Sequence, residues 1–358
     1  MKWLLAGILT IASAFSVAGE QSAHRHGDGK KSAVTAQAGK AAVKKTAQKA
    51  TVRKHVRHAK QTSGAKTRNK LHAKRGVKNT KVARHGRKSA NRYLAQRSDG
   101  SLFLMSSMAL VVNQEDGSTL YAKRPAVRAP IASLTKLMTA MVTLDANLPM
   151  DEPVTVTEAD VDTLRGSSSR LPVGATLSRE DMLHLALMAS ENRAASALAR
   201  HYPGGRHAFV DAMNRKADEL GMRQSWFSDP TGLRTENIST AQDLVKMVKA
   251  AYQYPMIRRF STSESHEVVF SGHSYPVLFR NTNALVKSEN WDIGLSKTGY
   301  INEAGRCLVM QARIAQQPVI IVLLDAQGTY TRIGDANRVK KWIETKALRA
   351  AVQAAKVG

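Results

Sequence analysis

The sequence predicts a fold of the α/β (α+β) class, in which helices flank an antiparallel sheet. Strand-like apolar runs lie near both ends of residues 99–358, and segments with helical periodicity lie between them. Residues 19–92 differ, because they contain no Phe, Tyr or Trp and a single leucine, Leu71. Such a segment cannot bury enough apolar surface to fold. We therefore expect a folded domain over 99–358 and a disordered Lys/Arg-rich tail over 19–98.

The strands are expected at the two ends of this domain. Residues 107–125 hold two strand-like runs on either side of Asp116-Gly117, a pair typical of hairpin turns. Three consecutive strands are expected over 291–300, 306–315 and 318–328. Cys307, the only cysteine, lies in one of them, so we expect a small buried hydrophobic residue there and no reactive thiol.

The helices are expected between these strands. Residues 130–141 read "PIASLTKLMTAM", where the apolar residues recur at the spacing of an amphipathic helix: Leu134, Leu137, Met138 and Met141. Further helices are expected over 176–190, 206–222 and 240–254. The first of these has Ser178 as N-cap with Asp181 in the capping-box position, Gly221 ends the second, and the third again has a Thr-x-x-Asp start, from Thr240 to Asp243.

A last helix is expected over residues 338–352. It could be an amphipathic anchor, but its apolar residues are better explained by packing on the sheet: Trp342, Ile343 and Leu348.

The N-terminus carries the features of an export signal. Lys2 precedes an apolar stretch, and Ser16-Val17-Ala18 fits a cleavage site. We predict a signal peptide over 1–18 that directs the protein to the periplasm, with an uncleaved anchor as the alternative.

Most of the net charge of +26 lies in the tail, since residues 21–92 hold 22 Lys or Arg and one acidic residue. A polycation of this kind associates with polyanions in a salt-dependent way. Export argues against a specific nucleic acid, so anionic envelope polymers are the expected partners. The sequence has no HExxH motif and no Cys/His cluster, and we predict neither a metal nor a cofactor.

Three short motifs carry the chemistry. Ser133-Leu-Thr-Lys136 places a lysine one helical turn after a serine, Ser190-Glu-Asn192 lies at the end of the helix that begins near Ser178, and Lys297-Thr-Gly299 ends a strand. The first two motifs are weak alone, because Ser63 to Lys66, Ser89 to Asn91 and Ser288 to Asn290 match them by chance, whereas Lys-Thr-Gly is rarer. Their order, wide separation and placement make the set specific.

These motifs resemble those of the penicillin-binding proteins and serine β-lactamases. Longer stretches, including "RPAVRAPIASLTKLMTAMVTLDANLP" and "SKTGYINEAGRCLVM", are similar to D-alanyl-D-alanine endopeptidases of the penicillin-binding protein 7 type. The resemblance covers about residues 105–345. It implies a β-lactamase/D,D-peptidase-like fold, with a five-stranded antiparallel sheet, flanking helices and a helical subdomain.

The resemblance also implies a role for each motif residue. Ser133 is the nucleophile, Lys136 is its base, and Ser190 passes a proton to the leaving amine. Asn192 holds the substrate amide and Lys136, and Lys297 supplies positive charge. The remaining residues bind substrate: Thr298, Gly299 and Tyr300. The backbone N–H groups of Tyr300 and Ser133 together form an oxyanion hole.

Ser190 could instead act only as the N-cap of the segment after it. The Glu-x-x-Leu-Asn motif with which some β-lactamases activate water is absent after Ser190. We therefore expect β-lactams to acylate Ser133 and leave slowly.

The expected function is that of a periplasmic serine D,D-endopeptidase that hydrolyses D-Ala–diaminopimelate cross-links of peptidoglycan through an acyl-enzyme. Two alternatives stay open at this point: a D-alanyl-D-alanine carboxypeptidase, and an inactive polycationic wall-binding protein.

Overall fold

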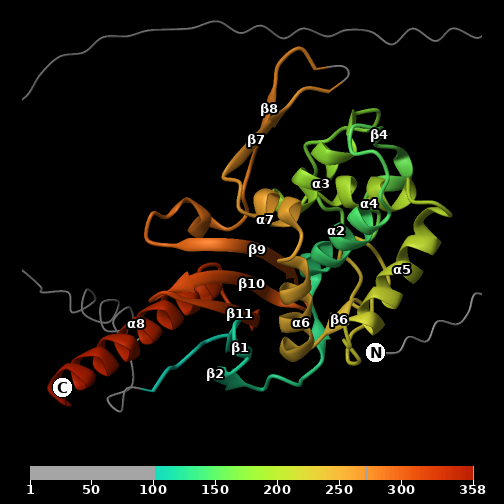
Figure 1. Cartoon of the computed structure of the whole chain (residues 1–358). Coiled ribbons are helices and arrows are strands. Elements are labelled where there is room, and N and C mark those ends of the chain that lie inside the picture. The colour runs from blue at the N-terminus through green and yellow to red at the C-terminus, as the bar shows by residue number, and fades with distance from the viewer. Residues whose placement is uncertain (1–100, 271–272, 358) are drawn as a thin grey trace, which may run out of the picture. The chain divides into compact units, whose positions relative to one another are not determined.

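The computed structural model describes residues 101–270 and 273–357 (Figure 1). The predicted signal peptide (1–18) and the predicted basic tail (19–98) lie outside the described residues. Within the described ranges, no helix combines the length and the apolar character that crossing a bilayer requires.

A five-stranded antiparallel sheet forms the centre, with the strand order β2-β1-β11-β10-β9. The first two strands come from the predicted hairpin, and the last three are the predicted consecutive strands: β1 (Met108–Asn113), β2 (Thr119–Lys123), β9 (Asp292–Ile301), β10 (Gly305–Ile314) and β11 (Gln317–Ala326). The predicted fold class is confirmed. Because β9 is an edge strand, one of its sides is free to face another part of the molecule.

Successive residues of the strands serve different faces of the sheet. On one face, Val111, Met310 and Ile321 pack in a cluster with α8 (Thr331–Val357). On the other face, Val309, Ile320 and Val322 join a larger cluster with the helices that precede β9. Cys307 in β10 is fully buried, as expected.

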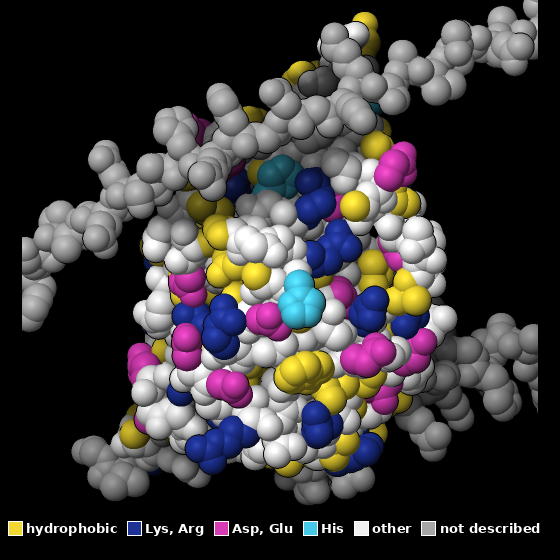
Figure 2. Space-filling view, turned by 90° about the vertical axis from the view of Figure 1, so that its right-hand side faces the viewer, with side chains coloured by type: hydrophobic (Ala, Val, Ile, Leu, Met, Phe, Trp, Pro, Cys, Tyr) yellow, Lys and Arg dark blue, Asp and Glu magenta, His cyan; other side chains and the backbone are white. Residues whose placement is uncertain are grey.

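The other helices lie between β2 and β9 in sequence, and those before β6 (Ile238–Ser239) form a helical subdomain beside the sheet (Figure 1). Their bounds are α2 (Lys136–Asp145), α3 (Arg179–Met188), α4 (Asn192–Arg200), α5 (Gly205–Glu219), α6 (Ala241–Ala251) and α7 (Pro255–Ser261). Single-turn 3₁₀ helices add to them: η2 (Ala132–Thr135), η3 (Glu158–Asp160) and η4 (Ala284–Lys287). On the side of the molecule that Figure 2 shows, Lys and Arg alternate with Asp and Glu.

Two predicted helix starts are confirmed in detail. Ser178 accepts a hydrogen bond from the backbone N–H of Asp181 (3.0 Å), and its hydroxyl donates to the Asp181 carboxylate (2.9 Å). Thr240 caps α6 in the same way, by accepting from the N–H of Asp243 (3.1 Å). A capped first turn satisfies backbone donors that otherwise lack a partner.

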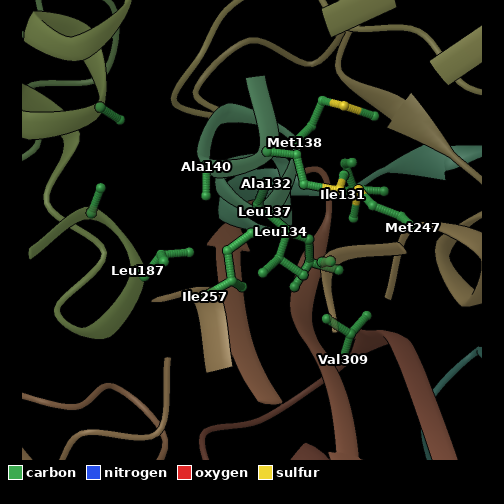
Figure 3. Close-up of a cluster of buried hydrophobic side chains, with 14 of the residues drawn as sticks. Ile131, Ala132, Leu134, Leu137, Met138, Ala140, Leu187, Met247, Ile257 and Val309 are labelled. Carbon is green, nitrogen blue, oxygen red and sulfur yellow. The ribbon is translucent and has the colours of Figure 1, made fainter. Parts of the chain in front are cut away.

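The helix after Ser133 differs from its prediction. Every residue of α2 from Lys136 to Thr143 is buried, so this helix has no solvent face over most of its length, and the amphipathic interpretation was wrong. Figure 3 shows Leu134 and Leu137 next to Ile257 of α7, with Val309 of the sheet below. The apolar spacing marks only part of the surface that α2 buries.

Leu348 was also wrongly placed. Trp342 and Ile343 are buried against the sheet, but Leu348 is 66% exposed. The helix α8 has 27 residues and is about 40 Å long, so its last turns extend past the sheet (Figure 1).

Short elements escaped prediction because they have too few residues for a periodic pattern. They are helix α7 and three two-stranded sheets: β3 (Ala129–Pro130) with β6 (Ile238–Ser239), β4 (Pro153–Thr155) with β5 (Thr176–Ser178), and β7 (Ser265–Val268) with β8 (Val277–Arg280).

Candidate active site

The backbone at Ser133 is held between two glycines. Gly232 approaches so closely that a Cβ atom there would lie 2.0 Å from the carbonyl oxygen of Ala132. A Cβ atom at Gly299 of β9 would lie 3.1 Å from the Ser133 nitrogen. Ala132 itself has φ +48°, in the left-handed region that costs a non-glycine residue free energy. The segment before α2 is thus fixed by its neighbours in a conformation that it would not adopt alone.

Lys136 lies at the first position of α2 and is fully buried. Its Nζ donates to the Ser133 hydroxyl (2.8 Å), to Asn192 Oδ1 (2.7 Å) and to the backbone carbonyl of Thr231 (2.7 Å). All three acceptors are neutral. Burial therefore dominates and lowers the pKa of Lys136 to about 7, although Asp229 and Glu191 oppose this change from a distance.

Lys297 and Ser190 form a second pair. Lys297 lies in β9, is buried, and its Nζ donates to the Ser190 hydroxyl (2.8 Å). Burial lowers the pKa of Lys297 well below its ordinary value, and the positive charges of Lys136 and Arg332 add to the effect. Ser190 follows α3 with φ +61°, which turns the chain between α3 and α4.

Ser190 does not cap α4. The N-cap of α4 is Glu191, whose side chain makes no capping hydrogen bond. The Ser190 hydroxyl accepts a hydrogen bond from Lys297. Glu191 accepts a hydrogen bond from Ser169 (2.6 Å), and Asn192 Nδ2 donates to Ser167 (2.9 Å). The segment 161–171 therefore supports the Ser-x-Asn motif from outside.

The last three predicted residues lie side by side in β9, which packs against η2. The Thr298 hydroxyl donates to Thr282 (2.8 Å), and the Gly299 carbonyl accepts from Arg332 Nη1 (2.9 Å). The Tyr300 ring is exposed under the guanidinium of Arg306, and its hydroxyl donates to Asn302 (2.8 Å). Gly299 lies against the backbone of Ser133, since a Cβ atom added there would be 3.1 Å from the Ser133 nitrogen.

The three motifs therefore meet at one place, with Lys136 bonded to Ser133 and Asn192, and Lys297 bonded to Ser190. The competing Ser288-Glu-Asn290 lies between η4 and β9, and no hydrogen bond joins it to either lysine. The other two chance matches, in residues 63–66 and 89–91, lie outside the described residues.

Sequence reasoning missed the loop 229–234, which supplies the third acceptor of Lys136. Asp229 shapes this loop, because its carboxylate accepts from the N–H of Thr231 (2.6 Å), Gly232 (2.8 Å) and Arg234 (2.9 Å). The Pro-Thr-Gly sequence marks a turn, but nothing in it points to a lysine 95 residues away. Arg332, near the start of α8, was missed for the same reason.

The arrangement fits nucleophilic catalysis. A buried lysine with a pKa near neutrality takes a proton from the hydroxyl it contacts, which activates that hydroxyl. Within the described residues, no group of three His, Cys, Asp or Glu side chains is placed to hold a metal ion.

Known proteins are similar to this chain in sequence and fold. The D-alanyl-D-alanine carboxypeptidase family profile matches residues 95–328. The chain is 49% identical over 253 residues to the D-alanyl-D-alanine endopeptidase of Pseudomonas aeruginosa, covering 71% of this chain and 82% of that protein. It is also 49% identical over 242 residues to the corresponding endopeptidase of Escherichia coli, covering 68% and 78%. The crystal structure of the Streptomyces K15 DD-transpeptidase superposes with a TM-score of 0.63 at 29% identity, covering 67% of this chain and 97% of that one.

Proposed function

The chain belongs to the D-alanyl-D-alanine carboxypeptidase family of serine-type hydrolases, and from this premise we propose that it is a D,D-endopeptidase. In this proposal it hydrolyses D-Ala–diaminopimelate cross-links of peptidoglycan through an acyl-enzyme on Ser133. The endopeptidase names of the two relatives at 49% identity favour cross-links over the terminal D-Ala that a carboxypeptidase removes.

Acylation begins at the Lys136–Ser133 pair. Neutral Lys136 takes the hydroxyl proton of Ser133 across their 2.8 Å hydrogen bond, and the oxygen attacks the D-Ala carbonyl. Asn192 and the Thr231 carbonyl keep Nζ in place during this step. Among the described residues, no carboxylate lies within hydrogen-bonding distance of the protonated lysine to hold the proton, which favours its onward transfer.

The backbone N–H groups of Ser133 and Tyr300 are the proposed oxyanion hole. Ser133 stands at the N-terminal end of η2 and α2, where the helix dipole favours negative charge, and Tyr300 follows Gly299 on the edge strand. A Cβ atom at position 299 would lie 3.0 Å from the Ile131 carbonyl oxygen and 3.1 Å from the Ser133 nitrogen, so glycine there lets β9 pack closely against the start of η2.

The Ser190–Lys297 pair handles the leaving amine. Ser190 donates its hydroxyl proton to the amine as the peptide bond breaks and regains a proton from protonated Lys136, while Lys297 holds the Ser190 oxygen through their 2.8 Å hydrogen bond. Lys297 also supplies positive charge near a substrate carboxylate. Water then attacks the ester on Ser133 and releases the D-Ala-terminated peptide.

The observation that carries the proposal is the buried lysine beside Ser133, bonded only to neutral oxygens. The same pair predicts reaction with β-lactams, which acylate an activated serine and would leave it slowly. Labelling with a fluorescent penicillin tests this. The wild-type protein should be labelled, and so should the control variant Ser118→Ala, because Ser118 is exposed in the turn between β1 and β2. A labelled Ser133→Ala variant would overturn the proposed nucleophile, and absence of labelling in wild type would favour an inactive wall-binding protein.

The choice of substrate needs a second assay. Purified cross-linked muropeptide dimers and free pentapeptides are digested in parallel, and the products are separated by chromatography. We expect cleavage of the dimers. Cleavage of pentapeptides alone would support the carboxypeptidase alternative.

We infer that the enzyme acts in the periplasm, because peptidoglycan lies outside the cytoplasmic membrane. The basic tail is proposed to tether it to anionic envelope polymers through solvated charges. Deletion of residues 24–92 should reduce binding to isolated sacculi at low salt and leave the cleavage of soluble dimers unchanged. Equal binding of the deletion variant would exclude a tethering role.

A further inference from the structure

One ion pair joins the two sides of the catalytic site. Arg165 Nη1 lies 3.0 Å from Glu303 Oε2. Arg165 belongs to segment 161–171, which reaches the Ser-x-Asn motif through the hydrogen bond between Ser167 and Asn192. Glu303 belongs to the turn between β9 and β10, just beyond the strand residues that carry Lys297 and Gly299.

The direction of β9 indicates which half of the substrate this pair meets. Lys297 and Ser190 serve the leaving amine, and Tyr300 faces the carbonyl that is attacked. Glu303 lies three residues past Tyr300, in the turn that follows the end of β9 away from Lys297. The pair therefore lies where the acyl half of the substrate, the stem peptide that ends in D-Ala, runs away from Ser133.

The two partners are held unequally. Arg165 is 22% exposed, its Nε donates to the Leu233 carbonyl (2.5 Å), and its backbone N–H donates to Asp162 (3.0 Å). Glu303 is 47% exposed at the tip of a turn, and among the described residues its carboxylate pairs with Arg165 alone. The guanidinium is thus fixed, and the carboxylate is the partner that can be exchanged.

We propose that Arg165 binds a carboxylate of the acyl-donor stem peptide, and that Glu303 occupies this position until the substrate displaces it. The stem peptide carries such groups on its glutamyl and diaminopimelyl residues, and a planar guanidinium suits a carboxylate. This inference rests on the proposed endopeptidase function. It assigns to Arg165 a binding role and to Glu303 a competing one.

If the Arg165–Glu303 ion pair only stabilised the structure, the expected result would differ. If the pair only held the two sides together, removing either charge would weaken the site in the same way. Under the exchange, Arg165→Gln removes the binding group, but Glu303→Gln removes its competitor. The two substitutions should then change KM in opposite directions.

The test measures kcat and KM for cross-linked muropeptide dimers with both variants. Arg165→Gln should raise KM about 10-fold, the usual effect of losing a hydrogen bond to a charged group, and Glu303→Gln should lower KM, with kcat changed little in both. The matched control is Glu180→Gln, which breaks another exposed ion pair, with Arg259 at 2.6 Å, and should leave KM unchanged. On dimers whose free carboxylates are amidated, Arg165→Gln should no longer raise KM.

Two results would overturn the exchange: a raised KM in Glu303→Gln, or an equal effect of Arg165→Gln on amidated and unamidated dimers. Fluorescent penicillin labelling of the same proteins reports separately on Ser133. Labelled variants with unchanged KM would overturn the exchange and leave the proposed function standing. An unlabelled wild type would overturn both.

Discussion

Two buried ionisable side chains of this molecule have opposite surroundings. Lys136 is surrounded by the neutral oxygens of Ser133, Asn192 and Thr231. Asp160, at the end of η3, pairs instead with the guanidinium groups of Arg200 (2.8 Å) and Arg206 (3.4 Å).

The consequences for ionisation differ accordingly. Burial lowers the pKa of Lys136 to about 7, and its neutral neighbours do not restore it. Burial also acts on Asp160, where it raises the pKa, but hydrogen bonds from Arg200, Thr157 and Ser196 outweigh it and the pKa is lowered. Burial without a counter-charge thus yields a base that can gain and lose a proton near neutral pH, whereas burial with counter-charges yields a permanently ionised structural group.

The largest expected effect is the loss of acylation rate when Lys136 is replaced. Lys136→Met keeps the length and apolar stem of the side chain but removes the base, so the rate of acylation by penicillin should fall about 10³-fold or more. Stopped-flow measurement of acylation checks this, with exposed Lys341→Met as the control that should match wild type. An acylation rate within a few-fold of wild type would show that Lys136 is not the base.

A smaller effect is expected from moving Ser133 relative to Lys136. Gly232→Ala would place a Cβ atom 2.0 Å from the Ala132 carbonyl, which must move the backbone of Ser133. Because misplacement by about 1 Å can cost 10²-fold in rate, acylation should fall about 100-fold.

The matched control for Gly232→Ala is Gly174→Ala. Gly174 has a similar φ (+87° against +83°), but a Cβ atom there meets nothing within 4 Å. The two variants should share the cost of backbone strain and differ in acylation. Equal acylation rates would mean that contact with Ala132 does not position Ser133.

The structural member of the comparison should affect stability instead of catalysis. Asp160→Asn removes the charge that pairs with Arg200 and Arg206, and should lower the free energy of unfolding by about 2–3 kcal/mol at pH 7. Because the pKa of Asp160 is lowered on folding, its contribution is complete above the ordinary value of 3.8 and is lost as the pH falls below that value. Urea unfolding of both proteins at pH 7 and at acidic pH measures this, and a difference that persists in acid would contradict the assignment.

The sequence could predict the parts of the site that residue types and short spacings determine. Ser133 and Lys136 are one turn apart, and the caps at Ser178 and Thr240 involve neighbours three residues away. Such contacts join residues three positions apart in the sequence, and the structure confirms these predicted contacts.

Contacts made by the backbone across the chain could not be predicted. Lys136 donates to the backbone carbonyl of Thr231, and because every residue type has such a carbonyl, the sequence does not mark this acceptor. The approach of Gly232 to Ala132 depends on how two loops pack. The burial of α2 on all sides likewise depends on helices that follow it in sequence, so its own apolar spacing showed only one face.

The central claim is that neutral Lys136 is the base that activates Ser133, and the pH dependence of acylation tests it most directly. The second-order rate constant for penicillin acylation should rise about tenfold per pH unit below a midpoint near 7 and level off above it, because only the unprotonated amine can accept a proton. A midpoint near the ordinary lysine pKa of 10.5, or a rate that does not change between about pH 5 and 9, would contradict the account.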